Sequence, residues 1–477
     1  MIRAFRANAR EHRASILVAA LSAAFGVALL ACTNVLSAYI GATDLGASTT
    51  AQIALSMVSA VFFVIAVYVG AIVTTNTFAT IIAGRTRTIA LLRLIGSSAQ
   101  AQRRSVAGEG LTVGIIGAVA GGAGAAALSL LATRLLTVAG VLPDRLYPVL
   151  TPTLLVPVVI VALTTWLASW IGSRRVLTVT PVQALGAAQE RPASAVRTRG
   201  RTIVALALIA VGVALLAVGV LLGLGVFGGV PVLEALGPYG ILVAFPGGIL
   251  SFTGIVLAAP LFLPAVLRGA GLLLGRGAAA RLAAANAVRN PERSSRTTIG
   301  LVIGVTLVTM FVVAAQSWLQ MIQQAAHDQP EVYAGVENIL TVTMVVFSVL
   351  VGFSAVIAAV GVVNSLALSV LQRARELGLL RALGFTGGQV RRMILAESVQ
   401  ITVAGVVTGL VLGSVYGWAG AQSLLAGIPG GGFVIPVLPW AYLGVVALAG
   451  AVLAVLASLA PTRRATRITP VAALAVE

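Results

Sequence analysis

The sequence contains no lysine, and that absence excludes two kinds of catalytic site. All 31 basic residues of the 477-residue chain are arginines. A phosphate-binding loop of the Walker type needs its lysine, and Schiff-base catalysis needs a lysine amine. We therefore expect no conventional ATPase site in this polypeptide.

Cysteine and histidine are nearly absent as well. The single cysteine, Cys32, cannot form an internal disulfide, and His12 and His327 are too few and too distant to bind zinc unaided. A Ser-His-Asp triad would have to use one of these histidines, and no nucleophile elbow accompanies either of them. The chain is therefore expected to be non-catalytic, with no metal or cofactor of its own.

Charged residues make up only 9% of the chain and hydrophobic residues 59%. An average soluble protein has roughly 25% charged residues, so this chain cannot cover a water-facing surface. The composition predicts an all-α polytopic membrane protein. Ten apolar stretches are long enough to cross a bilayer, which takes about 20 residues. They are 15–38, 52–82, 107–133, 151–172, 203–225, 239–266, 298–319, 339–370, 394–419 and 438–460.

The arginines are distributed unevenly among the segments between these spans. Twenty-nine lie before the first span or after an even-numbered span, whereas only Arg134 and Arg145 lie on the other side. The positive-inside rule then places both termini in the cytoplasm. The net charge of +18 is explained by topology, anionic lipids and partner docking rather than by nucleic acid. Trp166 and Trp170 fall near an inner span end, where we expect them to anchor the chain at the interface.

The chain also contains an internal repeat. An offset of 288 residues aligns 75–110 with 363–398 without a gap, and it pairs Gly96 with Gly384. Further along, 180–185 matches 469–474 at an offset of 289. Spans one to four and seven to ten are therefore copies of each other.

Two spans separate the copies, so both copies enter the membrane in the same orientation and form a parallel repeat. We predict a first four-helix repeat at 1–186, a central hairpin with its cytoplasmic linker at 187–277, and a second four-helix repeat at 278–477.

A short helix is predicted after the second span of each copy. In the first copy, the spacing of Leu91, Leu92 and Ile95 places them on one face, and Gly96 ends the helix. We interpret it as a docking helix for a cytoplasmic partner; an interfacial helix lying on anionic headgroups is the alternative. The docking residues are Arg85, Arg87, Leu91, Leu92, Arg93 and Gly96, and in the second copy Arg373, Arg375, Glu376, Leu379, Leu380, Arg381, Leu383 and Gly384.

The third span of each copy has a stripe of small residues at every fourth position. The glycines of these stripes are Gly117 and Gly121 in the first copy and Gly405, Gly409, Gly413 and Gly417 in the second. Because small residues at this spacing let helices approach closely in lipid, we expect both spans to pack inside the protein.

These features resemble the FtsX-like permease family, the membrane subunits of ABC transporters of the MacB type. The family's usual run, Arg-x-Arg-Glu-x-Gly-Leu-Leu-Arg-Ala-Leu-Gly, is met at 373–384, and a glutamate early in the next span is met by Glu109 and Glu397. The resemblance implies a separate ABC ATPase that binds ATP and Mg, with two copies per permease chain, in a bacterial plasma membrane. Thr88 replaces the glutamate in the first copy, so the sequence leaves open whether the two docking sites are equivalent.

Many members of this family have a large extracytoplasmic domain, but here the corresponding loops are only about 14 residues (39–51) and 19 residues (320–338). A substrate handled within the membrane fits better: a lipid, lipopeptide, antimicrobial peptide or antibiotic that is exported or extracted. One alternative is a signalling or mechanotransmitting complex without a transported substrate. The other is an ion-coupled secondary transporter, which would need ionisable groups at membrane depth; only Glu109 and Glu397 approach this.

Overall fold

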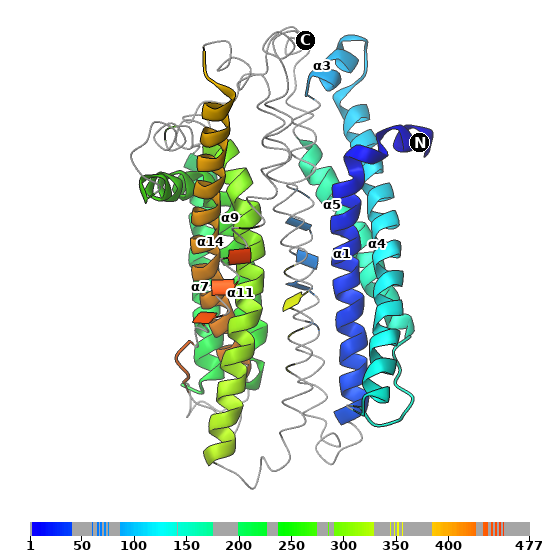
Figure 1. The fold of residues 1–477 in the computed structure, drawn as a ribbon, viewed down its shortest axis with the longest axis vertical. Coiled ribbons are helices and arrows are strands. Elements are labelled where there is room, and N and C mark those ends of the chain that lie inside the picture. Colours follow the sequence, from blue (N-terminus) through cyan, green and yellow to red (C-terminus); the bar gives the residue numbers. More distant parts are fainter. Residues whose placement is uncertain are drawn as a thin grey trace. The chain divides into compact units, whose positions relative to one another are not determined.

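The computed structural model describes residues 2–40, 86–140, 142–174, 199–226, 237–273, 291–328, 384–425 and 433–436, and scattered single positions at 60–75, 285, 344–355 and 440–452. Within this part the regular elements are all helical, as the composition predicts. The chain divides into two compact units, Met1–Gln189 and Glu190–Glu477. Each unit is described by itself below, and Figure 1 shows the helices of both.

In the part of the first unit that the structure describes, three long helices pack together. The helix α4 packs against both α1 and α5, and a short helix, α3, precedes α4 along the chain (Figure 1). The elements are α1 (Ile2–Ile40), α3 (Thr86–Leu94), α4 (Ala99–Val138), η2 (Pro152–Leu154) and α5 (Leu155–Gly172).

Glycines on two sides of α4 allow these close contacts. A Cβ on Gly117 would lie 2.7 Å from the Ile16 carbonyl oxygen of α1, and a Cβ on Gly121 would overlap the backbone of Ala20. On the α5 side, a Cβ on Gly114 would lie 2.9 Å from the Ala162 carbonyl oxygen. Lipid tails are as apolar as these helices, so the contacts stabilise the unit by van der Waals packing rather than by removing apolar surface from water.

The long helices described in the second unit form two pairs. The pair α11–α14 belongs to the second repeat and the pair α7–α9 is the central hairpin; α9 also contacts both α11 and α14. The elements are α7 (Arg199–Gly223), η5 (Gly237–Tyr239), α9 (Gly240–Leu273), α11 (Pro291–Asp328) and α14 (Gly387–Leu425). The helix α11 begins at Pro291, a position where proline is tolerated because its missing N–H has no helical partner to lose.

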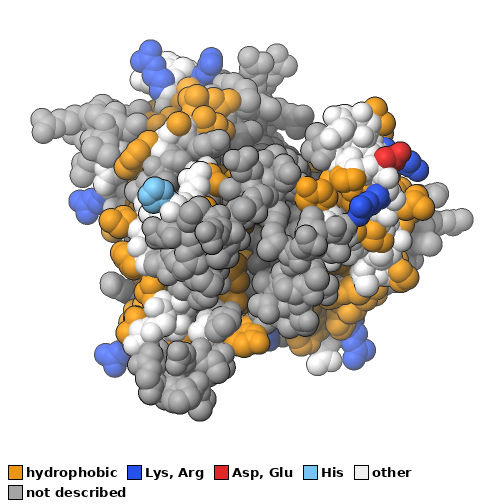
Figure 2. Space-filling model, turned by 90° about the horizontal axis from the view of Figure 1, so that it is seen from below, with side chains coloured by type: hydrophobic (Ala, Val, Ile, Leu, Met, Phe, Trp, Pro, Cys, Tyr) orange, Lys and Arg blue, Asp and Glu red, His pale blue; other side chains and the backbone are white. Residues whose placement is uncertain are grey.

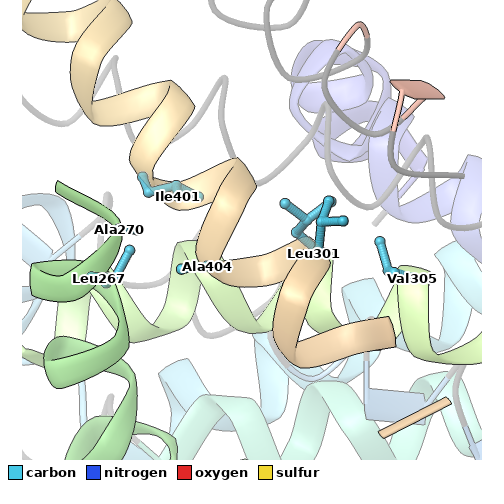
Figure 3. Packing of buried hydrophobic residues seen from close by; sticks show 7 residues of the cluster. Leu267, Ala270, Leu301, Val305, Ile401 and Ala404 are labelled. Atoms are coloured by element: carbon cyan, nitrogen blue, oxygen red, sulfur yellow. The ribbon is translucent and has the colours of Figure 1, made fainter. Parts of the chain in front are cut away.

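Figure 3 shows the core where three of these helices meet. Leu267 of α9, Leu301 and Val305 of α11, and Ile401 and Ala404 of α14 belong to one cluster of buried side chains. The hairpin is therefore part of the packed interior of the second unit.

Glycines at every seventh position of α9 let the two helices of the hairpin pack closely. This pattern was not predicted from the sequence. A Cβ on Gly212 of α7 would lie 2.7 Å from the Gly247 carbonyl oxygen of α9, and the reverse contact is equally short. The same antiparallel register is repeated one heptad to either side of this pair. The contacting pairs are Ala205 with Gly254, Gly212 with Gly247, and Gly219 with Gly240.

Three connections join the hairpin to α14 at different depths. At one end, the Gln400 side-chain amide donates a hydrogen bond to the Leu267 carbonyl oxygen of α9. In the middle, the hydroxyls of Ser251 and Tyr416 are 2.9 Å apart. At the other end, a Cβ on Gly240 would lie 2.9 Å from the Ser423 carbonyl oxygen.

Seven of the helices in the described part are long and apolar enough to cross a membrane. They coincide with the predicted spans one, three, four, five, six, seven and nine. The predicted spans 52–82, 339–370 and 438–460 lie outside the described residues, apart from isolated positions. The polytopic all-α prediction is confirmed, whereas the division into three domains remains a prediction.

Several helices extend beyond their predicted spans, and α11 is one of them. The predicted seventh span ends at 319 and the predicted outer loop starts at 320, but α11 continues to Asp328. Met321, Ile322 and Ala325 are buried in this extension. Their helical spacing gives the last two turns an apolar face, and the membrane-length apolar helix accordingly runs from Thr298 to His327.

Candidate functional site

The predicted docking helix of the first copy is present as α3, and one of its sides is exposed and apolar. Leu91, Leu94 and Ile95 are 49%, 50% and 81% exposed, whereas Ile89 and Ala90 are buried. The three exposed residues lie on one face because they are spaced by three and four positions. We call Leu91, Leu94 and Ile95 the α3 apolar face.

This face differs in one position from the predicted one. Leu92, which the sequence analysis placed with Leu91, is half-buried. Leu94 takes its place, and the three-and-four spacing from Leu91 is the signal that would have identified it. Arg87 and Arg93 also belong to α3, and Arg85 lies just outside the described residues.

A glycine in the left-handed region ends α3. Gly96 has φ of 101°, the Ser97 amide donates to the Leu92 carbonyl oxygen at 3.0 Å, and the Ile95 amide donates to that of Leu91 at 3.2 Å. The bond from Ser97 to Leu92 spans six residues, as in a Schellman cap. A side chain at Gly96 would be strained whatever space surrounds it.

The next helix starts almost at once. The Ser98 hydroxyl accepts a hydrogen bond from the Ala101 amide at 3.1 Å and caps the N-terminus of α4. The Gln102 side chain donates to the Ser97 hydroxyl at 2.8 Å. Only four residues separate α3 from α4, and caps on both sides fix the angle between them. We call residues 95–98 the first elbow.

The second copy has the same construction at the equivalent positions. Gly384 has φ of 96°, and Thr386 caps α14. The Thr386 hydroxyl accepts from the Gln389 amide at 3.3 Å, while the Gln389 side chain accepts from the Thr386 amide at 2.9 Å, which is a capping box. Gly384 and Thr386 follow Gly96 and Ser98 by 288 residues. We call residues 384–386 the second elbow.

The remaining candidate residues of the second copy precede this elbow and lie outside the described residues. They are Arg373, Arg375, Glu376, Leu379, Leu380, Arg381 and Leu383. The structure therefore describes the end of the second docking segment and not its helix.

The helix that follows each elbow, α4 or α14, contains the stripe of small residues. In the second unit all four stripe glycines face α11: a Cβ on Gly405 would lie 2.7 Å from Leu301, one on Gly409 2.6 Å from Val305, and one on Gly413 2.7 Å from the Thr306 carbonyl oxygen. Gly417 contacts Met310 of the same helix. Gly117 and Gly121 make the matching contacts to α1 in the first unit. Each elbow is thus followed directly by a helix of a tightly packed pair.

The outer surface of these helices is largely apolar. Exposed leucine, isoleucine and valine side chains follow α4, α5 and α7, and hydrophobic side chains occupy much of the described surface in Figure 2. Such a surface suits contact with lipid.

The family model described as FtsX-like permease C-terminal matches the chain twice, at residues 60–181 and 348–470. The two matches begin 288 residues apart and end 289 apart, which are the offsets of the internal repeat. Each match contains one elbow and one stripe of glycines. The two matches together cover just over half of the chain.

Curated relatives are similar over shorter regions. An uncharacterized ABC transporter permease of Bacillus subtilis, YknZ, is 29% identical over 147 residues, which are 31% of this chain and 35% of that protein. The pyoverdine export ATP-binding/permease protein PvdT of Pseudomonas entomophila is 34% identical over 124 residues, 26% of this chain and 18% of its own. The macrolide export ATP-binding/permease protein MacB of Photorhabdus laumondii is 32% identical over a region of the same size and coverage. The chain thus spans about a third or less of these relatives.

Proposed function

This chain belongs to the FtsX-like permease family, and from that premise we propose that it is the membrane subunit of an ABC transporter whose ATP is hydrolysed on a separate chain. The missing lysine supports the separate chain, because a Walker-type loop cannot be completed here. The relatives PvdT and MacB are named for both ATP binding and a permease, whereas YknZ is named only as a permease. The present chain is of the second kind.

The observation that supports this function best is the α3 apolar face beside a rigid elbow. Leu91, Leu94 and Ile95 are exposed at the arginine-rich end of the unit, where a soluble partner can cover them. Fully burying a leucine is worth about 1.5–3 kcal/mol. Leu91 and Leu94 are already about half-buried whereas Ile95 is largely exposed, so covering the face would contribute a few kcal/mol in total. Exposed arginines around it add about 0–1 kcal/mol each.

The elbow gives that contact a mechanical consequence. Since Gly96 and Ser98 hold α3 and α4 at a fixed angle, a push on α3 tilts α4 rather than bending the connection. The helix α4 in turn contacts α1 through Gly117 and Gly121. The motion of an ATPase would therefore enter the membrane as a rearrangement of packed helices.

The two elbows support two ATPase copies per chain. Both are built from a left-handed glycine and a capped helix start, and they lie at the repeat offset. We propose one ATPase on each, with the departure at Thr88 making the first contact different from the second.

For the substrate we propose a hydrophobic or amphipathic molecule such as a lipid, lipopeptide, antimicrobial peptide or antibiotic, exported or extracted from the membrane. The support is the apolar outer surface of α4, α5 and α7. The names of two relatives refer to export, of pyoverdine and of macrolides, and they support export as the direction of transport.

The test is to co-express the chain with a candidate ABC ATPase and to determine the composition of the complex by native mass spectrometry. We expect one permease to two ATPases. A complex with two permease chains and two ATPases would contradict the fused arrangement. For the substrate, ATP hydrolysis by the complex in nanodiscs should rise on addition of a lipopeptide or hydrophobic antibiotic; a rate that is insensitive to all such compounds would favour the signalling alternative.

A further inference from the structure

The end of the first unit near the elbow contains an arginine held against a tryptophan. The Arg103 guanidinium carbon of α4 lies 3.8 Å from the centre of the Trp170 ring of α5. One Arg103 Nη donates a hydrogen bond to the Trp170 carbonyl oxygen at 3.3 Å, and the Ser173 hydroxyl donates to the same oxygen at 2.8 Å. That carbonyl belongs to the last turn of α5, where the helix dipole attracts a cation. Arg103 is therefore fixed in place.

Arg103 retains unused hydrogen-bonding capacity. Its Nε is buried and has no hydrogen-bond partner, and a guanidinium has five N–H donors in all. The contacts described above use one of them and the face of the ion. An acceptor with several oxygens would satisfy the remainder.

Two further cations stand beside it. Arg104 follows Arg103 on α4, and Arg174 lies one turn after Trp170, just past the end of α5; both are exposed. On α4 the first acidic residue is Glu109, almost two turns further into the helix and half-buried. The end of this helix pair therefore has three positive charges close together.

Exposed apolar side chains begin directly beyond these cations. Trp166 and Trp170 are 40% and 37% exposed, as expected for tryptophans at a membrane interface. Leu163 of α5 and Ile115 of α4, further along the pair, are 53% and 48% exposed. The surface thus passes from cations through aromatic rings to aliphatic side chains within a few helical turns.

We propose that Arg103, Arg104, Arg174 and Trp170 form a binding site for the headgroup of an anionic phospholipid, whose acyl chains lie along the exposed aliphatic side chains of α4 and α5. The sequence of cation, aromatic ring and aliphatic surface matches the order of groups in such a lipid. An acidic protein surface could pair with Arg104 and Arg174, but it would not use the rings and leucines that continue from them. The proposal does not depend on ATP coupling.

The two copies of the repeat differ in the residues of this site. Arg103 and Arg174 have counterparts in Arg391 and Arg463, but the residues that match Trp166 and Trp170 are Val455 and Leu459. The second copy therefore has the arginines without the rings. It supplies a matched control within the same chain.

The test uses the purified full chain, delipidated in detergent and titrated with phosphatidylglycerol or phosphatidylcholine, with bound lipid counted by native mass spectrometry. The Arg104→Gln, Arg174→Gln double variant removes two exposed charges and leaves the cap of α5 intact. We expect its affinity for phosphatidylglycerol to fall by at least about fivefold, since each basic side chain near an anionic surface contributes a severalfold preference. Phosphatidylcholine binding should not change. The control, Arg392→Gln with Arg463→Gln, changes the two counterparts and should alter phosphatidylglycerol affinity by less than about twofold.

A second variant tests the ring. Trp170→Leu installs the residue of the second copy, and we expect it to lower phosphatidylglycerol affinity as well, with circular dichroism unchanged. Equal losses in the control and the test variants, or no loss in either, would overturn the proposal. Displacement of the lipid by inorganic phosphate at similar concentration would show that the site takes a free anion. A double variant that keeps the lipid but loses the ATPase would show that this is a protein contact instead.

Discussion

The hydroxyl groups of Ser251 and Tyr416 lie 2.9 Å apart and join the central hairpin to the second repeat in the middle of the membrane-length helices. Ser251 is on α9 and Tyr416 is on α14, and the Tyr416 ring also meets Phe252 edge to face at 6.0 Å between centroids. The position that matches Tyr416 in the first copy is Leu128, which is 55% exposed. The hairpin therefore has a polar partner in one copy that the other copy lacks.

Removing the Tyr416 hydroxyl should loosen the hairpin slightly. We expect Tyr416→Phe to lower stability by about 0.5–1.5 kcal/mol, because the ring contact stays and one hydrogen bond is lost. Thermal unfolding in detergent measures the change. Ser251→Ala should cost a similar amount, and the double variant little more than either alone. Fully additive losses would mean that the two hydroxyls do not act as a pair.

The glycine stripe of α14 offers a comparison within one helix. A Cβ on Gly413 would lie 2.7 Å from the Thr306 carbonyl oxygen, whereas one on Gly420 would meet nothing within 4 Å. Gly413→Ala should destabilise by about 1–3 kcal/mol through overpacking, and Gly420→Ala should be neutral or stabilising by up to about 1 kcal/mol. Chemical or thermal unfolding of both variants decides this. The same result for the two would place the stripe on a lipid-facing side.

The first elbow depends on the backbone of Gly96. We expect Gly96→Ala to lower stability by about 1–2 kcal/mol because φ of 101° is unfavourable with a Cβ, and Gly96→Asn to be tolerated better. Gly124→Ala in α4, a helical position with open space around it, is the control. If ATP hydrolysis by the assembled complex also uncouples from substrate in Gly96→Ala alone, the elbow transmits motion; unchanged coupling would leave it with a structural role only.

The α3 apolar face should determine ATPase association. We expect Leu91→Asp with Leu94→Asp to abolish most binding of one ATPase while the chain still inserts in the membrane, since two exposed apolar contacts worth a few kcal/mol are replaced by charges. Co-purification and native mass spectrometry measure it. Gln100→Asp places one negative charge near the elbow without removing an apolar residue, and it should bind normally. Full binding by the double leucine variant would identify α3 as an interfacial helix.

Local signals in the sequence predict the elbows well. Gly96 and Gly384, together with the hydroxyls of Ser98 and Thr386, specify helix ends through their own backbone and side-chain chemistry, so nothing distant is needed to place them. The packing face of the stripe glycines can likewise be predicted from the sequence, because their spacing alone defines one face of the helix. Leu94 was not predicted, because the leucines shared by the two copies are Leu91 and Leu92. The three-residue spacing from Leu91 is the signal that identifies Leu94.

The position of the hairpin could not be predicted in the same way. Residues 187–277 lie between the two copies in the sequence, and nothing in their hydropathy favours one copy over the other. The choice rests on side chains elsewhere in the chain: Gln400 and Tyr416 bind the hairpin, while their counterparts Thr112 and Leu128 do not offer the same groups. A tertiary preference of this kind becomes visible only when the partners are brought together.

Because the hairpin is attached to α14, the helices that follow the two elbows differ in how many described helices pack against them. After the second elbow, α14 is hydrogen-bonded to α9 at several depths and packs against α11 along its glycines. A tilt of α14 must therefore move the four long helices that the structure describes in this unit. Behind the first elbow, α4 is in contact with α1 and α5 and has Ile116, Leu128 and Leu135 exposed where the hairpin would sit. If one ATPase acts on each elbow, as we propose, equal forces would displace α4 further than α14, because fewer of the described helices are packed with α4.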